Sequence, residues 1–142
     1  MGMKVNKILV GGCFDILHFG HVHFLKKAKG LGDHLVVLLE SDISVKKLKG
    51  DTRPIHSESQ RKEILESLNF VDEVIILPEM KSDEDYKKII LEISPSVIAT
   101  TKGDPILEKK RAHGKSVGAE VVEIEKVEIP SSSQIAKLLD IE

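Results

Sequence analysis

The order of apolar runs along this chain restricts its fold more than any other feature. Five short runs rich in β-branched residues alternate with longer segments in which apolar residues recur at helical spacing. The expected strands are 7–10, 35–39, 73–77, 97–100 and 120–124, and the expected helices are 18 or 19 to 29, 58–68, 83–92, 106–116 and 132–139. Strands joined by helices pair in parallel through right-handed crossovers. The order therefore predicts an α/β fold, a Rossmann-like doubly wound parallel sheet of about five strands, in a single domain over residues 1–142.

Length and charge narrow the classes of function. The chain has 142 residues, 41% apolar and 31% charged, which suits one domain with its own core. The formal net charge is only −2 and both signs are interspersed, so nucleic acid is not an expected partner. No apolar run approaches the ~20 residues of a membrane span, and no cleavable leader pattern is present, so a cytoplasmic protein without membrane attachment is expected. Cys13 is the single cysteine, which leaves no disulfide or cysteine-based zinc site within one chain.

A glycine turn and two histidines follow the first expected strand, in the sequence GGCFDILHFGH at 11–21. Glycines let a phosphate approach the backbone, and the start of the next helix offers unpaired N–H groups. His18 and His21 are three residues apart and share one helix face, with Gly20 clearing space between them. A single histidine at a helix start is usually structural, but this combination predicts phosphate binding. His23 lies about 200° around the helix from His21, so the three histidines do not converge on one metal ion.

Polar and basic residues in later loops are further candidates. Sheets of this type bind ligands beyond the carboxyl ends of their strands, where the strand order reverses. Asp104 follows the fourth expected strand and is expected either to contact ribose or base or to cap the next helix. Lys46, Lys49 and Arg53 lie after the second strand, around the loop-like interval 50–54, where a mobile cationic loop could close on a triphosphate. The alternative for the lysines is ordinary solvation.

Three more candidates have competing structural explanations. Arg61 lies near the start of an expected helix, where a cation opposes the helix dipole, and this favours an anion-binding purpose. Asp15 could help to hold Mg²⁺ through water or could simply accept turn amides. Ser131, Ser132 and Ser133 open the last expected helix, where they could hold phosphates or serve as its N-cap.

The segment His18-Phe19-Gly20-His21 matches the HxGH signature, so the chain resembles the nucleotidylyltransferase superfamily, which includes cytidylyltransferases and phosphopantetheine adenylyltransferases. The longer string Gly-Gly-Cys-Phe-Asp-Ile-Leu-His looks most like the adenylyltransferase part of bacterial ADP-heptose synthases. The serine turn at 131–133 is similar to a second signature of this superfamily. The likeness covers nearly the whole chain, continuing through 32–33, 41–42, 44–50, 53–54, 60–61, 71–72 and 102–104.

The resemblance implies an enzyme that transfers the nucleoside monophosphate of an NTP, with AMP favoured, to a phosphorylated small polar acceptor. A sugar phosphate is the expected acceptor, and pyrophosphate is released by direct in-line displacement. His18 and His21 would bind the α-phosphate. Lys46 or Lys49 would neutralise the triphosphate together with Arg61, and the serine turn would hold the departing pyrophosphate. The residues expected to contact the nucleotide besides the histidines and serines are Gly12, Cys13, Phe14, Gly20, Lys49, Arg53 and Asp104. Mg²⁺ is expected to enter with the NTP, and the resemblance implies a homodimer.

Three alternatives stay open. One is a cytidylyltransferase that uses CTP on glycerol 3-phosphate or a similar alcohol phosphate, but where such enzymes have Arg-Thr this chain has Glu125-Lys126-Val127-Glu128. That departure weakens the case for cytidine. A second is an FAD synthase acting on FMN, although one Tyr and no Trp leave few rings to stack on a flavin. A third is a non-catalytic nucleotide-binding module of the same fold, for which the two histidines would seldom be needed.

Overall fold

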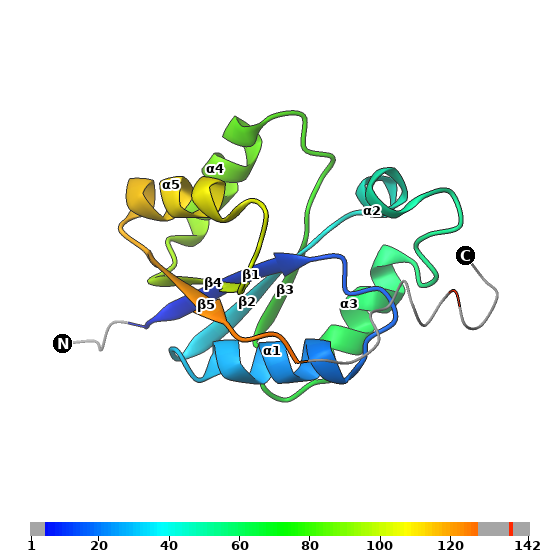
Figure 1. The fold of residues 1–142 in the computed structure, drawn as a ribbon, viewed down its shortest axis with the longest axis horizontal. Helices are drawn as coiled ribbons and strands as arrows, with labels where there is room; N and C mark the ends of the chain where they lie inside the picture. Colours follow the sequence, from blue (N-terminus) through cyan, green and yellow to red (C-terminus); the bar gives the residue numbers. More distant parts are fainter. Residues whose placement is uncertain (1–4, 128–136, 138–142) are drawn as a thin grey trace.

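A five-stranded parallel sheet forms the centre of the protein (Figure 1). The structure is a computed structural model, and it describes residues 5–127 and residue 137. The strands are β1 (Lys7–Gly12), β2 (His34–Leu39), β3 (Glu73–Ile76), β4 (Val97–Thr101) and β5 (Glu120–Ile124). They lie in the order β3-β2-β1-β4-β5, with every neighbouring pair parallel. The predicted Rossmann-like fold and its five strands are confirmed.

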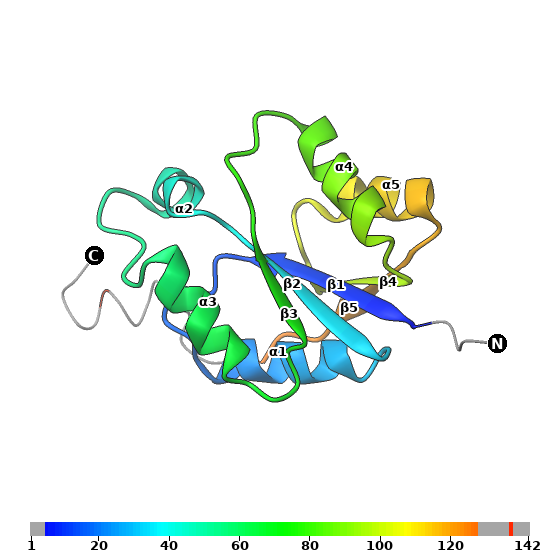
Figure 2. The same cartoon turned by 180° about the vertical axis from the view of Figure 1, so that it is seen from behind.

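Helices cover both faces of the sheet in the part of the chain that is described. They are α1 (Phe19–Lys29), α2 (Asp42–Lys49), α3 (Glu58–Glu66), α4 (Asp83–Ile93) and α5 (Leu107–Val117). Helices α1 and α3 lie on one face, and α4 and α5 lie on the other, as the views from the front and from behind show (Figures 1 and 2). The chain thus winds from β1 towards β3, crosses to the opposite face, and returns through β4 and β5. The strand order reverses between β1 and β4.

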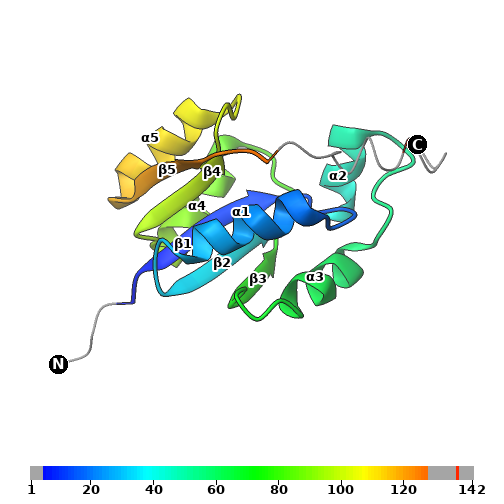
Figure 3. The same ribbon diagram turned by 60° about the horizontal axis from the view of Figure 1, so that its bottom comes forward.

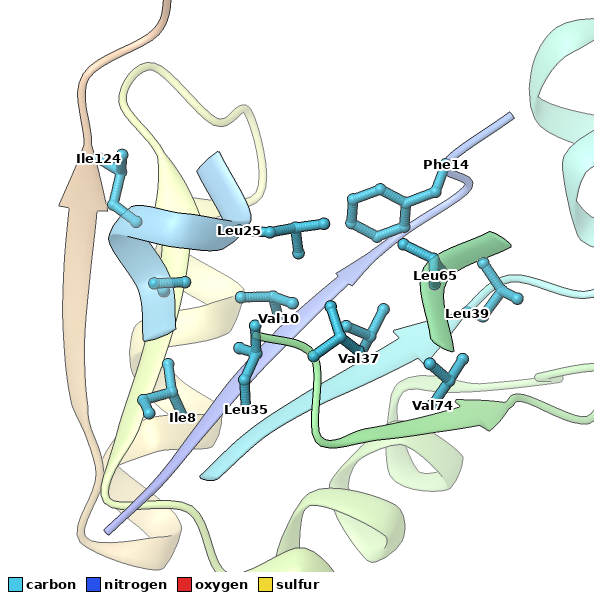
Figure 4. Close-up of a cluster of buried hydrophobic side chains, with 13 residues drawn as sticks. Ile8, Val10, Phe14, Leu25, Leu35, Val37, Leu39, Leu65, Val74 and Ile124 are labelled. Carbon is cyan, nitrogen blue, oxygen red and sulfur yellow. The ribbon is translucent and has the colours of Figure 1, made fainter. Parts of the chain in front are cut away.

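Alternate residues of the central strands form two apolar cores. Ile8 and Val10 of β1 belong to the cluster beneath α1 and α3, whereas Leu9 between them belongs to the cluster beneath α4 and α5. Successive strand side chains point to opposite faces, so a strand buried on both faces must be apolar throughout. Figure 4 shows the first cluster, in which Leu25 of α1 and Leu65 of α3 pack over β1 and β2. This explains why the sequence shows continuous apolar runs.

Local signals fix the ends of the elements. Ser57 begins α3 with a capping box, because its Oγ accepts from the Gln60 N–H while the Gln60 side chain accepts from the Ser57 N–H. Between α1 and β2 the chain passes so close to β1 that a Cβ on Gly32 would lie 2.7 Å from the carbonyl oxygen of Asn6. The absence of a side chain at Gly32 therefore allows α1 to pack against the sheet.

Two expectations about the stretch after β2 were wrong. Residues 42–49 form helix α2 rather than a loop, with Ser41 as N-cap and Val45 as its buried residue. The helix is short, and three of its eight residues are lysines, a composition that also suits a loop. The 50–54 interval does connect two helices, but Arg53 in it is only 2% exposed and is not part of an open cationic loop. The expected helix over 132–139 lies outside the described residues, apart from residue 137. Within the described chain, no helix is both long and apolar enough to cross a membrane.

Candidate active site

A cavity of about 660 Å³ opens at the carboxyl ends of β1, β4 and β5, where the strand order reverses. Open α/β sheets bind ligands in this position. From the loop after β1 and the start of α1 it is lined by Gly12, Cys13, Phe14, His18, Gly20 and His21. Lys49 at the end of α2 and Asp104 after β4 complete the predicted residues that the structure brings together there. The cavity therefore unites segments that are far apart in the sequence.

The two histidines hold the start of α1 as well as lining the cavity. His18 is the N-cap, and its Nδ1 accepts from the Gly20 N–H at 3.1 Å. His21 completes a capping box, because its Nδ1 accepts from the His18 N–H at 3.3 Å. The two rings stack with centroids 3.9 Å apart, and the His21 and Phe14 rings contact each other in a T-shaped arrangement. Backbone contacts thus fix the place of both imidazoles before any ligand binds.

Burial keeps both imidazoles neutral near pH 7. It lowers the pKa of His18, and together with the nearby His18 and Lys49 it lowers the pKa of His21 to about 4. Because each Nδ1 accepts a hydrogen bond, the ring proton of each neutral histidine must be on Nε2. The pair can therefore offer two Nε2–H donors to an anion, with the positive charge at this side of the cavity coming from Lys49.

Arg61 is not in the cavity, contrary to the expectation that it neutralises a triphosphate. Its guanidinium is buried and donates to the carbonyl oxygens of Cys13, Glu40 and His56 at 2.8–3.0 Å and to Asp42 Oδ1 at 2.9 Å. It therefore ties the loop after β1 to the end of β2 and to the segment before α3. The position of Arg61 in the sequence indicated an anion-binding residue, but it could not show that backbone carbonyl oxygens accept the hydrogen bonds of this guanidinium.

Asp15 and Arg53 also lie beneath the loops instead of facing the cavity. Arg53 Nε donates to Asp15 Oδ2 at 2.7 Å, and neither side chain is exposed. Asp15 also accepts from the N–H groups of Ile55 and His56, at 2.7 and 3.0 Å. Burial alone would raise the pKa of Asp15, but these hydrogen bonds and the Arg53 charge lower it overall. The predicted nucleotide contact of Arg53 and the possible Mg²⁺ role of Asp15 do not fit this placement.

Lys110 is a cavity residue that sequence reasoning missed. Its ammonium contacts Asp104 Oδ2 and donates to Thr100 Oγ1 at 2.9 Å, while the Thr100 hydroxyl donates to the same carboxylate. Burial raises the pKa of Asp104, but the contacts from Lys110, Thr100 and the Ile106 N–H lower it overall. The Ile106 contact at 2.9 Å shows that Asp104 also supports the turn into α5. No motif marks a lysine six residues after Asp104.

The remaining candidates lie elsewhere. Lys46 is exposed on α2 and does not line the cavity, whereas Lys102 and Lys126 do. Lys102 pairs with Glu125 at 3.1 Å across the ends of β4 and β5. Ser131, Ser132 and Ser133 lie outside the described residues. Among the residues that are described, no group of three or more His, Cys, Asp or Glu side chains is arranged to hold a metal ion.

Comparison with known proteins agrees with this geometry. The model of the cytidylyltransferase-like family matches residues 9–137, which include the two histidines and nearly all of the sheet. The chain belongs to the cytidylyltransferase-like family. This membership confirms the predicted superfamily and the predicted class of enzyme, a nucleotidyltransferase.

The relatives of this cytidylyltransferase-like chain include bifunctional HldE proteins and an FAD synthase. It is 45% identical over 116 residues to the bifunctional protein HldE of Campylobacter fetus subsp. fetus, a match that covers 81% of this chain and 23% of that protein. It is 42% identical over 125 residues to the FAD synthase of Thermococcus sibiricus, covering 85% of this chain and 81% of that one. The chain thus spans about a quarter of the length of the HldE relatives.

Two solved structures share the fold. The lipopolysaccharide core biosynthesis protein from Thermoplasma volcanium GSS1 has a TM-score of 0.72 and 29% identity, covering 88% of this cytidylyltransferase-like chain and all of that one. A pantoate-beta-alanine ligase from Francisella tularensis, solved with beta-gamma ATP and beta-alanine, has a TM-score of 0.67 at 16% identity, covering 96% of this chain and 67% of that one. The second likeness concerns the fold alone.

Proposed function

We propose that this chain transfers the nucleoside monophosphate of an NTP, with AMP favoured, to a sugar phosphate and releases pyrophosphate. The observation that carries the proposal is the stacked His18–His21 pair, which is held at the start of α1 and lines the cavity at the strand-order reversal. Family membership and the HldE relatives support the reaction class and the acceptor class. Preference for ATP rests on the sequence resemblance to ADP-heptose synthases.

The reaction is a direct in-line displacement. An oxygen of the acceptor phosphate bonds to the α-phosphorus, the bond from that phosphorus to the bridging oxygen breaks, and pyrophosphate leaves with the electron pair. The acceptor is already an anionic nucleophile, so the protein contributes positioning and charge stabilisation rather than a strong base. The Nε2–H groups of His18 and His21 donate to the α-phosphate oxygens as their charge grows, and Lys49 offsets the charge of the triphosphate.

The two sides of the cavity suit different halves of the nucleotide. Near the histidines Lys49 supplies positive charge, whereas at the end of β4 the charge of Lys110 is offset by Asp104 and that of Lys102 by Glu125. A neutral, hydrogen-bonding wall suits ribose hydroxyls or a base edge, and the cationic side suits phosphates. Lys126, which follows β5, also lines the cavity and adds positive charge there, so we place the nucleoside against β4 alone. Ser131, Ser132 and Ser133 are proposed to hold the pyrophosphate.

Mg²⁺ is proposed to be bound through the NTP phosphates and not by a protein cage. The buried Asp15 carboxylate is occupied by Arg53 and two backbone N–H groups, so it does not offer a ligand oxygen to the cavity. When bound with the NTP, Mg²⁺ supplies neutralisation of phosphate charge.

Transfer of AMP to FMN is the second candidate, because the FAD synthase of Thermococcus sibiricus is matched over most of its own length. Phe14 and Phe24 are the aromatic residues besides histidine that line the cavity among the described residues. Few rings are therefore present to stack on a flavin. A homodimer in the cytoplasm is proposed from the family resemblance, and sedimentation velocity tests the dimer.

The deciding experiment measures pyrophosphate release with Mg²⁺ for ATP, CTP, GTP and UTP against sugar 1-phosphates including heptose phosphates, glycerol 3-phosphate, and FMN. We expect release with ATP and a sugar phosphate. Pyrophosphate release from ATP with FMN as the only effective acceptor would establish the second candidate. Release from CTP with glycerol 3-phosphate would establish a cytidylyltransferase. Nucleotide binding without release for any pair would overturn the proposed catalysis in favour of a binding module.

A further inference from the structure

The loop that leads to the histidine pair has an unfavourable backbone conformation. Phe14 and Ile16 have φ values of 47° and 57°, in the left-handed region that favours glycine. A β-branched residue such as Ile16 rarely adopts it. Such a conformation persists where surrounding contacts hold it, and the residue between the two, Asp15, makes those contacts.

Asp15 connects the loop to the segment between α2 and α3. Its carboxylate accepts from Arg53 Nε and from two consecutive backbone N–H groups, of Ile55 and His56. Both side chains of the ion pair are fully buried. Two residues earlier in the same loop, Arg61 donates to the carbonyl oxygen of Cys13. The backbone is therefore held on its buried side at two points, directly before α1 begins.

The position of these contacts relates them to the cavity. Asp15 is three residues before His18, so the direction in which the chain leaves Asp15 determines where the N-cap lies. Phe14, next to Asp15, contacts the His21 ring at a centroid distance of 5.3 Å. We propose that the buried Asp15–Arg53 pair is a positioning pair, which holds the strained loop so that His18 and His21 stay stacked with both Nδ1 atoms bound to the backbone. Its effect on turnover rests on the proposed function, but its effect on the histidines does not.

The test replaces both charges at once in the double variant D15N/R53M. A single replacement would leave one buried charge without its partner and endanger folding. The matched control is K29M/D72N, because Lys29 and Asp72 also form an ion pair, at 2.6 Å, and Asp72 also accepts a backbone N–H, that of Leu35. That pair lies at the amino end of β2, away from the cavity.

The main readout is nitrogen NMR of the histidine rings, titrated without substrate. In the wild type we expect His18 and His21 to carry the proton on Nε2 and His21 to titrate near pH 4. In D15N/R53M we expect mixed tautomers and a His21 pKa raised towards 6.5, with no change in K29M/D72N. Removing the Asp15 charge by itself would lower the His21 pKa, because that charge raises it. An upward shift therefore reports loosening and not lost charge.

Turnover provides the second readout. For D15N/R53M we expect kcat to fall at least about tenfold, since small displacements of catalytic groups are costly, while KM for the NTP changes little. A folded double variant with wild-type tautomers and titration would overturn the positioning role. If it does not fold, R53K, which keeps the charge but not the guanidinium geometry, is judged by the same NMR criterion. Inactivity of the wild type would count against the proposed function, while the NMR result would still decide this inference.

Discussion

At the residue scale, His18 combines two roles that one variant can separate. Its Nδ1 caps α1, whereas its Nε2–H is available to the cavity. Asn is an excellent N-cap but is too short to replace Nε2. We expect H18N to keep wild-type stability and lose about 10²–10³ in kcat, whereas H18A should also lose about 1 kcal/mol of unfolding free energy. Urea unfolding and steady-state kinetics measure both, and normal turnover of H18N would refute the catalytic role.

The depressed pKa of His21 predicts how stability depends on pH. Its value of about 4 lies below the ordinary 6.5, so between these values the unfolded chain binds more protons than the folded one. The free energy of unfolding should therefore be highest above about pH 6.5. It should decrease by about 2 kcal/mol as the pH falls towards 4, after allowance for partial solvent screening. Urea unfolding at several pH values tests this. In the H21Q variant the free energy of unfolding should depend less steeply on pH. An unchanged slope would show that a group other than His21 causes the dependence.

Sequence reasoning identified residues of the site better than it identified their contacts. It located Gly12, Cys13 and Phe14 and both histidines, because a motif between a strand and a helix fixes where its residues lie. It misjudged Arg53 and Arg61, because spacing along the chain does not show whether a cation reaches a ligand or a buried carbonyl or carboxylate. It could not find Lys110, whose role depends on packing between α5 and β4.

At the scale of elements, the end of α4 offers a test of backbone strain. Ser94 closes α4 with φ at 52°, in the left-handed region. Gly adopts this conformation without penalty, so S94G should raise the unfolding free energy by about 0.5–1 kcal/mol.

Ser67 at the end of α3 is the control for this prediction, because its φ is −76° and its hydroxyl donates to the Ile64 carbonyl oxygen at 2.6 Å. S67G should therefore lower stability. Thermal unfolding of both variants measures the effects, and stabilisation by both would show that strain at Ser94 is not the cause.

The elements themselves were predictable where their apolar pattern is strong. The observed bounds of β5 are those expected, and α1 and α4 begin where expected. Helix α2 was missed because it is short, with eight residues that follow a serine and include three lysines, a composition that also suits a loop. The sequence predicted a doubly wound fold but not which strands are neighbours. The pairing of β1 with β4, for example, joins residues about 90 positions apart in the sequence.

At the scale of the whole molecule, the proposed nucleotide should protect one end of the sheet. The cavity is formed by loops at the carboxyl ends of β1, β4 and β5, and the turns at the amino ends do not line it. With ATP and Mg²⁺ we expect slower hydrogen exchange in 11–21 and 100–106 and unchanged exchange in 30–33 and 94–96. We also expect a melting temperature that rises with nucleotide concentration. Protection confined to the amino-end turns would contradict the proposed site.

The direction of β1 has a practical consequence for handling the protein. This six-residue central strand runs from Lys7 towards the cavity, so its first residue lies ~16 Å from Gly12 at its other end. Figure 3 shows its start at the end of the molecule opposite α2. A tether, fluorophore or fused reporter joined ahead of Lys7 would therefore leave the ligand entrance unobstructed, which makes this end the natural attachment point for a surface-immobilised nucleotide sensor.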